Sequence, residues 1–158
     1  MIITDLYKEA QAVSLTPKGY SEDELEQIAR LYNIVIEGQL KAFLAEMGRS
    51  DGGLIGDDMI HLYRPTWNVR THLFFQFQFF NDIQDIGCFE FLNKPFVFAW
   101  ISETQYYFVQ TSIGDQVFHY DENTEEVHET EWDLLGFIQY LARNSQSKLR
   151  AEGDLLRI

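Results

Sequence analysis

The chain has 158 residues, of which 46% are hydrophobic and 15% aromatic, enough apolar surface for one folded core and too much for wholesale disorder. Its formal net charge of −13 opposes phosphate backbones and anionic membrane surfaces, so we expect neither nucleic acid nor a membrane as its partner. No segment approaches the about 20 apolar residues of a membrane-spanning helix, because Gln76, Gln78 and Asn81 interrupt the most apolar stretch.

Cysteine usage and the first residues indicate the compartment. Cys88 is the one cysteine, so a disulfide framework is excluded, and its neighbours in "IGCFEF" favour a buried, unreactive thiol. The opening "MIITDLYKEAQ" has neither a basic start nor a long apolar segment, so it predicts no secretory signal. We expect a cytoplasmic protein with a single domain over residues 1–158, a core at about 21–143 and a polar C-terminal tail over 144–158.

A capping box predicts the start of a helix at Ser21. Glu24 follows Ser21 by three residues, the spacing at which each side chain bonds the other's backbone N–H. The acidic first turn also suits the positive end of the helix dipole. Apolar residues then recur at helical spacing, at Leu25, Ile28, Leu31 and Tyr32. Before this helix, residues 1–20 predict a short helix and a turn near Pro17.

A second amphipathic helix and a glycine-rich loop come next. The apolar stripe of the helix comprises Leu40, Phe43, Leu44 and Met47. Gly48 is placed to end this helix, and "RSDGGLIGDD" then reads as a loop. The following "MIHLYRP" is predicted to be a strand that stops at Pro65.

The stretch "LFFQFQFF", residues 73–80, is compatible with two kinds of structure. Phe75, Phe77 and Phe79 alternate with glutamines, as in a half-buried strand. A strand does not account for Ile83 and Ile86, however, which continue a helical face. We therefore predict a helix from about residue 69 to 86, ended by the glycine that follows, with its phenylalanines in the core.

The second half of the chain changes to short β-branched and aromatic runs. "FVFAWI", "QYYFVQT", "QVFHYD" and "EEVHET" are separated by turn-like segments, which predicts an antiparallel meander. A closing helix is expected in "TEWDLLGFIQYLARN", with Thr130 as its candidate cap. Helices first, strands second and a final helix indicate an α+β domain in which helices flank an antiparallel sheet.

The four histidines do not form a recognisable metal motif. No HxxxH or HExxH pair is present, and His119 and His128 would be neighbours on adjacent strands without a third ligand. We expect the histidines to be exposed or hydrogen-bonded. No metal and no cofactor are predicted.

The glycine-rich loop and the possible nucleophiles give no catalytic signature. "DGGLIGDD" lacks the Lys-Ser/Thr ending of a P-loop, and as a calcium loop it lacks the required oxygen ligands, so turn geometry is the preferred interpretation. No G-x-S-x-G elbow occurs. We predict no catalytic residues, although a carboxylate-dependent hydrolase stays open because 25 Asp and Glu residues offer too many pairs to rank.

A run of acidic residues is the most prominent charge feature. No Lys or Arg occurs between positions 121 and 133. The candidate partner-binding residues are Asp121, Glu122, Glu125, Glu126 and Glu129. Such a patch suits a basic protein, whereas the alternative is a strand edge protected from aggregation by its charge. Trp67, Trp100 and Trp132 are candidates for interface anchors or core residues.

The order of these features resembles the SUKH superfamily, which includes fungal cell-wall-assembly regulators and bacterial toxin-immunity proteins. In "LEQIARLYNIVIEGQLKAFLAEMGRSDGGLIGDDMIHLYRP", Phe43 and Leu44 match the family's "fL" pair. The glycines at 52, 53 and 56 match its turn, and Met59, Ile60 and Leu62 its strand. The later strands are similar too, with a "G.Vy.yd" stretch at Gly114, Val117, Phe118, Tyr120 and Asp121.

The likeness covers about residues 21–143, with two departures. Val35 and Ile36 stand where Leu-Pro is usual, and "ISETQ" replaces a glycine-containing turn. The resemblance implies a non-enzymatic protein-binding domain, most plausibly an immunity protein that occludes a toxin, with a basic nuclease as one candidate partner. A regulatory scaffold of the cell-wall-assembly type is the alternative that the fungal members imply.

Overall fold

The structure is a computed structural model that describes residues 17–56, 58–145 and 151–158. Its fold is α+β, as the order of the sequence patterns predicts. The helices are α2 (Glu22–Tyr32), α3 (Gly38–Met47), α4 (Val69–Asp85) and α5 (Leu134–Asn144). The strands are β1 (Pro95–Ile101), β2 (Gln105–Gln110), β3 (Gln116–Asp121) and β4 (Glu126–Asp133). The helix expected near the N-terminus falls within residues 1–16, outside the described part of the chain.

The four strands form an antiparallel meander in the order β1-β2-β3-β4, which confirms the predicted connectivity. Short turns join successive strands because β-branched and aromatic runs alternate with turn-forming residues along the chain. β1 and β4 are the outer strands. A bulge between Val97 and Ala99 interrupts the register of β1 with β2.

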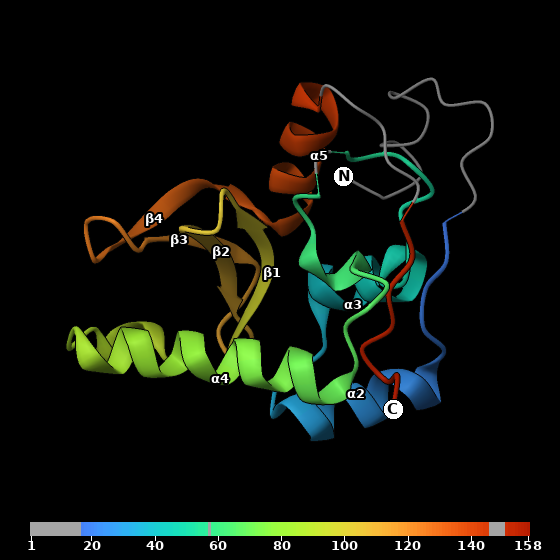
Figure 1. The fold of residues 1–158 in the computed structure, drawn as a ribbon, viewed down its shortest axis with the longest axis horizontal. Coiled ribbons are helices and arrows are strands. Elements are labelled where there is room, and N and C mark those ends of the chain that lie inside the picture. The colour runs from blue at the N-terminus through green and yellow to red at the C-terminus, as the bar shows by residue number, and fades with distance from the viewer. Residues whose placement is uncertain (1–16, 57, 146–150) are drawn as a thin grey trace.

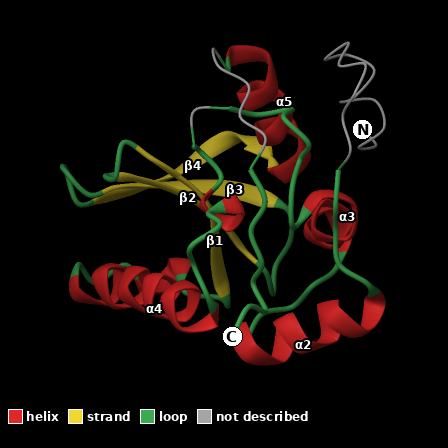
Figure 2. Cartoon of the chain, turned by 45° about the vertical axis from the view of Figure 1, so that its right-hand side comes forward, coloured by secondary structure: helices red, strands yellow, loops and turns green. Residues whose placement is uncertain are grey.

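Helices cover both faces of the sheet (Figure 1). α4 packs on one face, where Phe79 and Ile83 contact Phe108 and neighbouring aromatic residues. Figure 2 shows α5 on the opposite side, where its apolar residues join those of α2 and α3 in a second cluster with Val109 and Val117. Because successive side chains of a strand point to opposite faces, neighbours such as Phe108 and Val109 enter different clusters. Within the described residues, no helix has both the length and the apolar character needed to cross a membrane.

The two helices predicted before residue 50 are confirmed. The hydroxyl of Ser21 accepts a hydrogen bond from the Glu24 N–H, and the Glu24 carboxylate accepts one from the Ser21 N–H, which forms the capping box. Asn33 ends α2 in the left-handed conformation, with φ at 53°. The predicted apolar stripe of α3 is fully buried and consists of Leu40, Phe43, Leu44 and Met47.

One predicted strand and one predicted helix cap are wrong. "MIHLYRP" is not a strand, because His61–Tyr63 form a 3₁₀ turn in which every side chain is buried. In a strand with one exposed face, buried and exposed side chains would alternate, and here they do not. The segment is joined to β1 by a backbone hydrogen bond from the Trp100 N–H to the Met59 carbonyl. The closing helix is capped by Asp133, whose carboxylate accepts from the Gly136 N–H, whereas Thr130 lies within β4.

The helix predicted over the phenylalanine-rich stretch is confirmed as α4, but not all of its phenylalanines are buried. Phe79 is buried and Phe75 is half-buried against the sheet. Phe74 and Phe77 are 67% and 64% exposed, so the expectation that this stretch is entirely core is wrong. Five phenylalanines within eight residues span more of the helix circumference than a single sheet can cover.

Candidate functional site

The last described residues are an integral part of the core. Leu155 is fully buried, its carbonyl accepts a 2.7 Å hydrogen bond from the Tyr32 hydroxyl, and its N–H donates to the Tyr20 hydroxyl at 2.8 Å. The N–H of Gly153 donates to the Arg49 carbonyl at 2.9 Å. Residues 151–158 are therefore a docked segment, in contrast to the polar tail predicted for 144–158.

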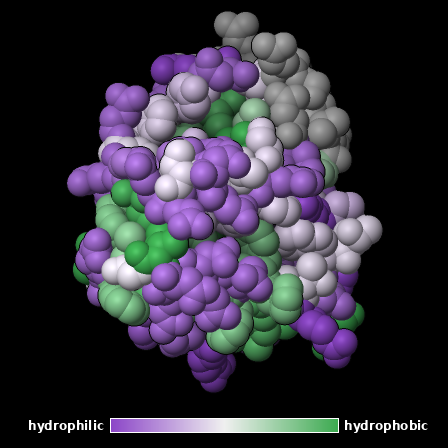
Figure 3. Space-filling view, turned by 60° about the vertical axis from the view of Figure 1, so that its left-hand side comes forward, coloured by the Kyte–Doolittle hydropathy of each residue, from purple (hydrophilic) through white to green (hydrophobic). Residues whose placement is uncertain are grey.

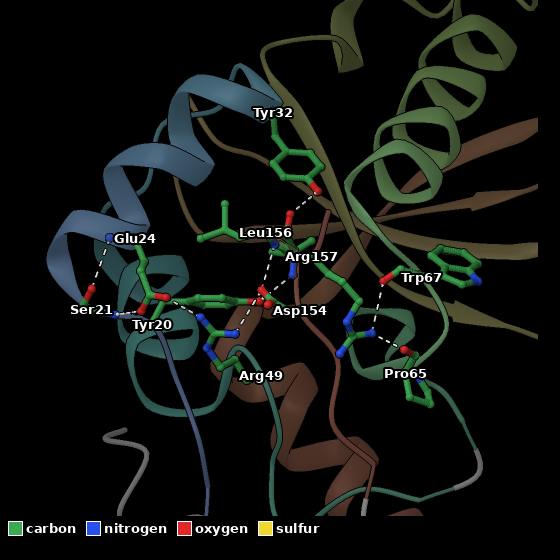
Figure 4. Close-up of polar contacts among 11 residues, drawn as sticks. Tyr20, Ser21, Glu24, Tyr32, Arg49, Pro65, Trp67, Asp154, Leu156 and Arg157 are labelled. Carbon is green, nitrogen blue, oxygen red and sulfur yellow. Dashed lines mark hydrogen bonds and ion pairs between the residues drawn. The ribbon is translucent and has the colours of Figure 1, made fainter.

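Arg49 holds this segment against α2 (Figure 4). Its guanidinium lies 3.0 Å from the Asp154 carboxylate, also pairs with Glu24, and stacks 4.4 Å from the centre of the Tyr20 ring. The hydrogen bond from the Ser21 N–H is the main cause of the lowered pKa of Glu24, which favours the ionised form that this contact requires. Burial raises the pKa of Tyr20 to about 12, so the hydroxyl that accepts from the Leu155 N–H stays protonated.

The docked segment continues to the start of α4. The Val69 N–H donates a 2.7 Å hydrogen bond to the Arg157 carbonyl, and the Arg157 guanidinium donates to the backbone carbonyls of Pro65 and Trp67. Leu156 and Arg157 thereby lie between the N-terminal end of α4 and the helix α2 (Figure 4).

An apolar groove opens along this junction. Its volume is about 940 Å³, and residues of α2, α4 and the docked segment line it. The lining side chains are Gln27, Leu31, Asn68, Val69, Arg70, Leu73, Phe74, Phe77, Leu156, Arg157 and Ile158. A second hollow of about 330 Å³ shares Leu31, Leu73 and Phe77 with it and extends the groove to Lys94 and Pro95. We call this combined hollow the α2/α4 groove.

The charge of the α2/α4 groove is opposite to that of the protein. Its lining includes Arg70, Arg157 and Lys94 and contains no Asp or Glu. The whole chain, in contrast, carries 25 acidic and 12 basic residues. Within the described part of the chain, the side chains of Arg70 and Lys94 form neither an ion pair nor a hydrogen bond. This surface is therefore apolar with a cationic border.

Four of the five acidic residues proposed from the sequence gather at one end of the sheet. Asp121 ends β3 and pairs with Glu126 at the start of β4, while Glu122 and Glu125 occupy the turn between them. Glu129 lies three residues farther along β4 and so points to the opposite face from Glu126. We call Asp121, Glu122, Glu125 and Glu126 the acidic hairpin end.

Few positively charged groups lie next to the carboxylates of the acidic hairpin end. His128 lies 3.0 Å from Glu126, and no Lys or Arg of the described residues forms an ion pair with this group. The sequence contains no Lys or Arg from residue 95 to 142. A hydrogen bond from Gln105 lowers the pKa of Asp121, which stays ionised at neutral pH.

An aromatic hollow adjoins the acidic hairpin end. It has a volume of about 240 Å³ and lies between α4 and the sheet. Its lining side chains are Trp67, Thr71, Phe74, Phe75, Gln78, Phe79, Trp100 and Tyr106. The Tyr106 hydroxyl donates a 3.2 Å hydrogen bond to the Glu122 carboxylate, and Gln78 donates to Asp82 at 3.1 Å. Seen from the side of the hairpin turn, an apolar patch is framed by hydrophilic side chains (Figure 3).

Two of the histidines are buried without a full set of hydrogen bonds. His61 donates one bond to the Val97 carbonyl at 2.9 Å, and its Nδ1 has no partner among the described residues. Neither ring nitrogen of His72 has one. The expectation that all four histidines are exposed or hydrogen-bonded is therefore wrong for His72. Burial is the main cause of the lowered pKa of both, to about 4 for His72.

The remaining histidines, the carboxylate of Asp51 and the thiol of Cys88 do not lie together in one site. His119 and His128 are paired across β3 and β4, but the described residues contain no group of three or more potential metal ligands. The buried carboxylate of Asp51 accepts hydrogen bonds from the N–H groups of Gly53, Leu54 and Ile55, so it organises its loop. Cys88 is half-buried, less enclosed than its sequence context predicts.

The α2/α4 groove was not predicted from the sequence. Helical spacing places Leu31 in an apolar stripe, and the phenylalanine-rich pattern predicts that Phe74 and Phe77 are in the core, yet all three side chains are exposed. The sequence does contain one indication of the groove: the apolar residues of α4 span more of the helix circumference than one sheet can bury, so some of them must face away from the sheet. No protein-family model, curated protein or solved structure matches the chain.

Proposed function

We propose that this chain is a non-enzymatic protein-binding domain that neutralises a toxin domain by covering its working surface. The acidic hairpin end and the aromatic hollow form the contact. The observation that carries the proposal is the hydrogen bond between Tyr106, which lines the hollow, and Glu122 of the hairpin, because it makes the apolar and acidic parts one continuous surface.

The charge of this surface favours a basic partner. Three carboxylates of the hairpin end are exposed to solvent, at Glu122, Glu125 and Glu126. Complementary fields accelerate association and suppress partners of the same sign. A nuclease that binds nucleic-acid phosphates presents such a basic surface, and carboxylates that occupy it block access to the substrate.

The aromatic hollow supplies the apolar centre that stable interfaces need. Trp67 and Trp100 are half-buried, and their ring centres lie 6.3 Å apart beside Phe75. Tryptophan and tyrosine are enriched among the residues that dominate binding energy, especially where a charged rim surrounds an apolar centre. An apolar side chain of the toxin would enter this hollow while its basic residues meet the hairpin.

The direct test is coexpression with a toxin encoded beside this chain, followed by titration of the purified pair. We expect rescue of growth and a 1:1 complex. The triple substitution Glu122→Gln, Glu125→Gln and Glu126→Gln should weaken binding at least 10-fold, mostly through slower association.

A matched control removes the same charge elsewhere, with Asp23→Asn, Glu26→Gln and Glu46→Gln at exposed positions of α2 and α3. Equal weakening by both triple variants would show that net charge alone acts and would contradict the assigned surface. Failure to rescue growth, or the absence of a neighbouring toxin, would contradict the proposed function.

A further inference from the structure

We propose that the α2/α4 groove is a second binding site, which takes an amphipathic helix of a partner protein with apolar residues on one face and acidic residues at its flanks. This site goes beyond the proposed function, because it lies along a different side of α4 from the aromatic hollow. Residues 73 and 77 of α4 line the groove alone and residues 71, 75 and 78 line the hollow alone, while Phe74 lies on the ridge between them and borders both.

The dimensions of the groove fit a short helix. The α4 residues that line it run from Val69 to Phe80, a distance of about 16 Å at the rise of an α-helix. A bound helix of about three turns has this length. Two helices, α2 and α4, form its walls, and a third helix can pack its side chains into the apolar rows of such a pair.

The walls of the groove are apolar groups that the described fold leaves uncovered. Leu31 is 44% exposed, Phe74 67% and Phe77 64%. These side chains come from α2 and α4 and line the same groove. Single exposed apolar residues are common on protein surfaces, but apolar residues gathered in one groove often mark a binding site. Large apolar side chains gathered in this way are typical of a surface that a partner buries.

The charge of the groove selects the partner. Arg70 and Arg157 lie at the end near the start of α4, and Lys94 lies at the other end. The Arg157 guanidinium is held in place by backbone carbonyls, which leave its charge uncompensated. No Asp or Glu side chain of the described residues lines the groove, so acidic residues at the flanks of a bound helix would find the cationic side chains of Arg70, Arg157 and Lys94 at its two ends.

The same charges disfavour a second copy of this chain as the occupant. A symmetric dimer through the groove would place Arg70 and Lys94 of both copies in one interface, where like charges repel. A basic toxin surface is disfavoured for the same reason. The two sides of α4 therefore suit partners of opposite charge.

A displayed library of amphipathic helices tests this site directly, because selection itself reveals which helix the groove prefers. The library has 14 designed positions, with Leu or Phe at helical spacing and a free choice of Glu, Lys or Gln at the flanks. We expect selected helices to be enriched in Glu over Lys at both flanks. A representative peptide should bind at least 10-fold more weakly to Leu31→Ser/Phe77→Ser, two exposed positions where a polar residue does not disturb the core.

Charge reversal gives the sharper result. Arg70→Glu places an acidic residue in the first turn of α4, where the helix dipole tolerates it, so the fold should be retained. Selection against this variant should shift the preference at one flank from Glu towards Lys. The control Arg143→Glu, exposed on α5 away from the groove, should leave the preference unchanged.

Several outcomes would overturn the site. These are selection of no helix, selection of basic flanks, or binding that Leu31→Ser/Phe77→Ser does not weaken. Saturable binding of dodecanoate without selection of helices would indicate a lipid site instead, and dimerisation through the groove in sedimentation experiments would indicate a second copy. The hairpin variant Glu122→Gln/Glu125→Gln/Glu126→Gln should bind the selected peptide normally, so failure here is distinguishable from failure of the proposed function.

Discussion

The side-chain amide of Gln76 binds both backbone polar groups of Val97. Its oxygen accepts from the Val97 N–H at 2.9 Å and its nitrogen donates to the Val97 carbonyl at 2.7 Å. Val97 lies in β1, an outer strand of the sheet, at the bulge where the register with β2 shifts. The amide thus takes the place of a neighbouring strand and covers part of the sheet edge.

Replacement of Gln76 by Met is expected to destabilise the fold by about 1–3 kcal/mol, because the Val97 N–H would be left without its partner in an enclosed position. Urea unfolding monitored by tryptophan fluorescence measures the change. Gln78→Met removes an amide from the exposed side of α4 and should change the free energy of unfolding by less than about 0.5 kcal/mol. Equal effects of the two substitutions would contradict the role assigned to Gln76.

Gly153→Ala is expected to undock the C-terminal segment. A Cβ at this position would lie 2.1 Å from the Leu62 carbonyl oxygen and 2.9 Å from the backbone of Tyr63, neither of which can rotate away. The cost should exceed about 2 kcal/mol, and backbone amides of 153–157 should exchange faster in hydrogen-exchange experiments. Glu152→Ala, at the exposed neighbouring position, removes only a surface ion pair with Lys18, a contact of small expected effect, and serves as the control. Unchanged exchange in Gly153→Ala would show that the close contact does not hold the segment.

Tyr32→Phe removes the hydroxyl that donates to the buried Leu155 carbonyl. We expect a loss of about 1–2 kcal/mol in the free energy of unfolding, because the carbonyl loses its partner without access to water. Tyr140→Phe removes a hydroxyl from an exposed tyrosine of α5 and should be nearly neutral. A neutral Tyr32→Phe would indicate that the segment is held mainly by Arg49 and by apolar contacts.

The buried histidines predict acid sensitivity. The pKa of His72 is lowered to about 4 in the folded chain, against about 6.5 when unfolded, so below pH 6.5 the unfolded chain binds a proton that the folded chain rejects. Stability should be independent of this group above pH 6.5 and fall as the pH drops towards 4, by about 2 kcal/mol at pH 5 for His72 alone. The lowered pKa of His61 acts in the same direction.

His72→Phe tests this expectation, since a phenyl ring suits the aromatic surroundings near Trp67, which lies 5.2 Å away between ring centres. Free energies of unfolding at pH 7.5, 6.0 and 5.0 should decline less steeply for this variant than for the natural chain. Parallel curves for the natural chain and His72→Phe would show that carboxylates cause the acid sensitivity.

The sequence by itself determined the class of the fold and most of its elements. The capping box at Ser21, the four buried residues of α3 and the alternating runs of β1–β4 depend on interactions between near neighbours, so they are visible in spacing alone. The acidic hairpin end was predictable for the same reason, because a tight turn necessarily brings Asp121 close to Glu126.

Only the tertiary structure decided which apolar residues are covered. The sequence pattern places Leu155 in a polar tail and Phe77 in the core, yet Leu155 is fully buried and Phe77 is 64% exposed. Their difference arises from contacts between segments far apart in the chain, since Tyr20 and Tyr32 hold Leu155 in place while no described segment lies over Phe77. The α2/α4 groove is a product of that packing, because its walls come from elements that no local pattern relates to one another.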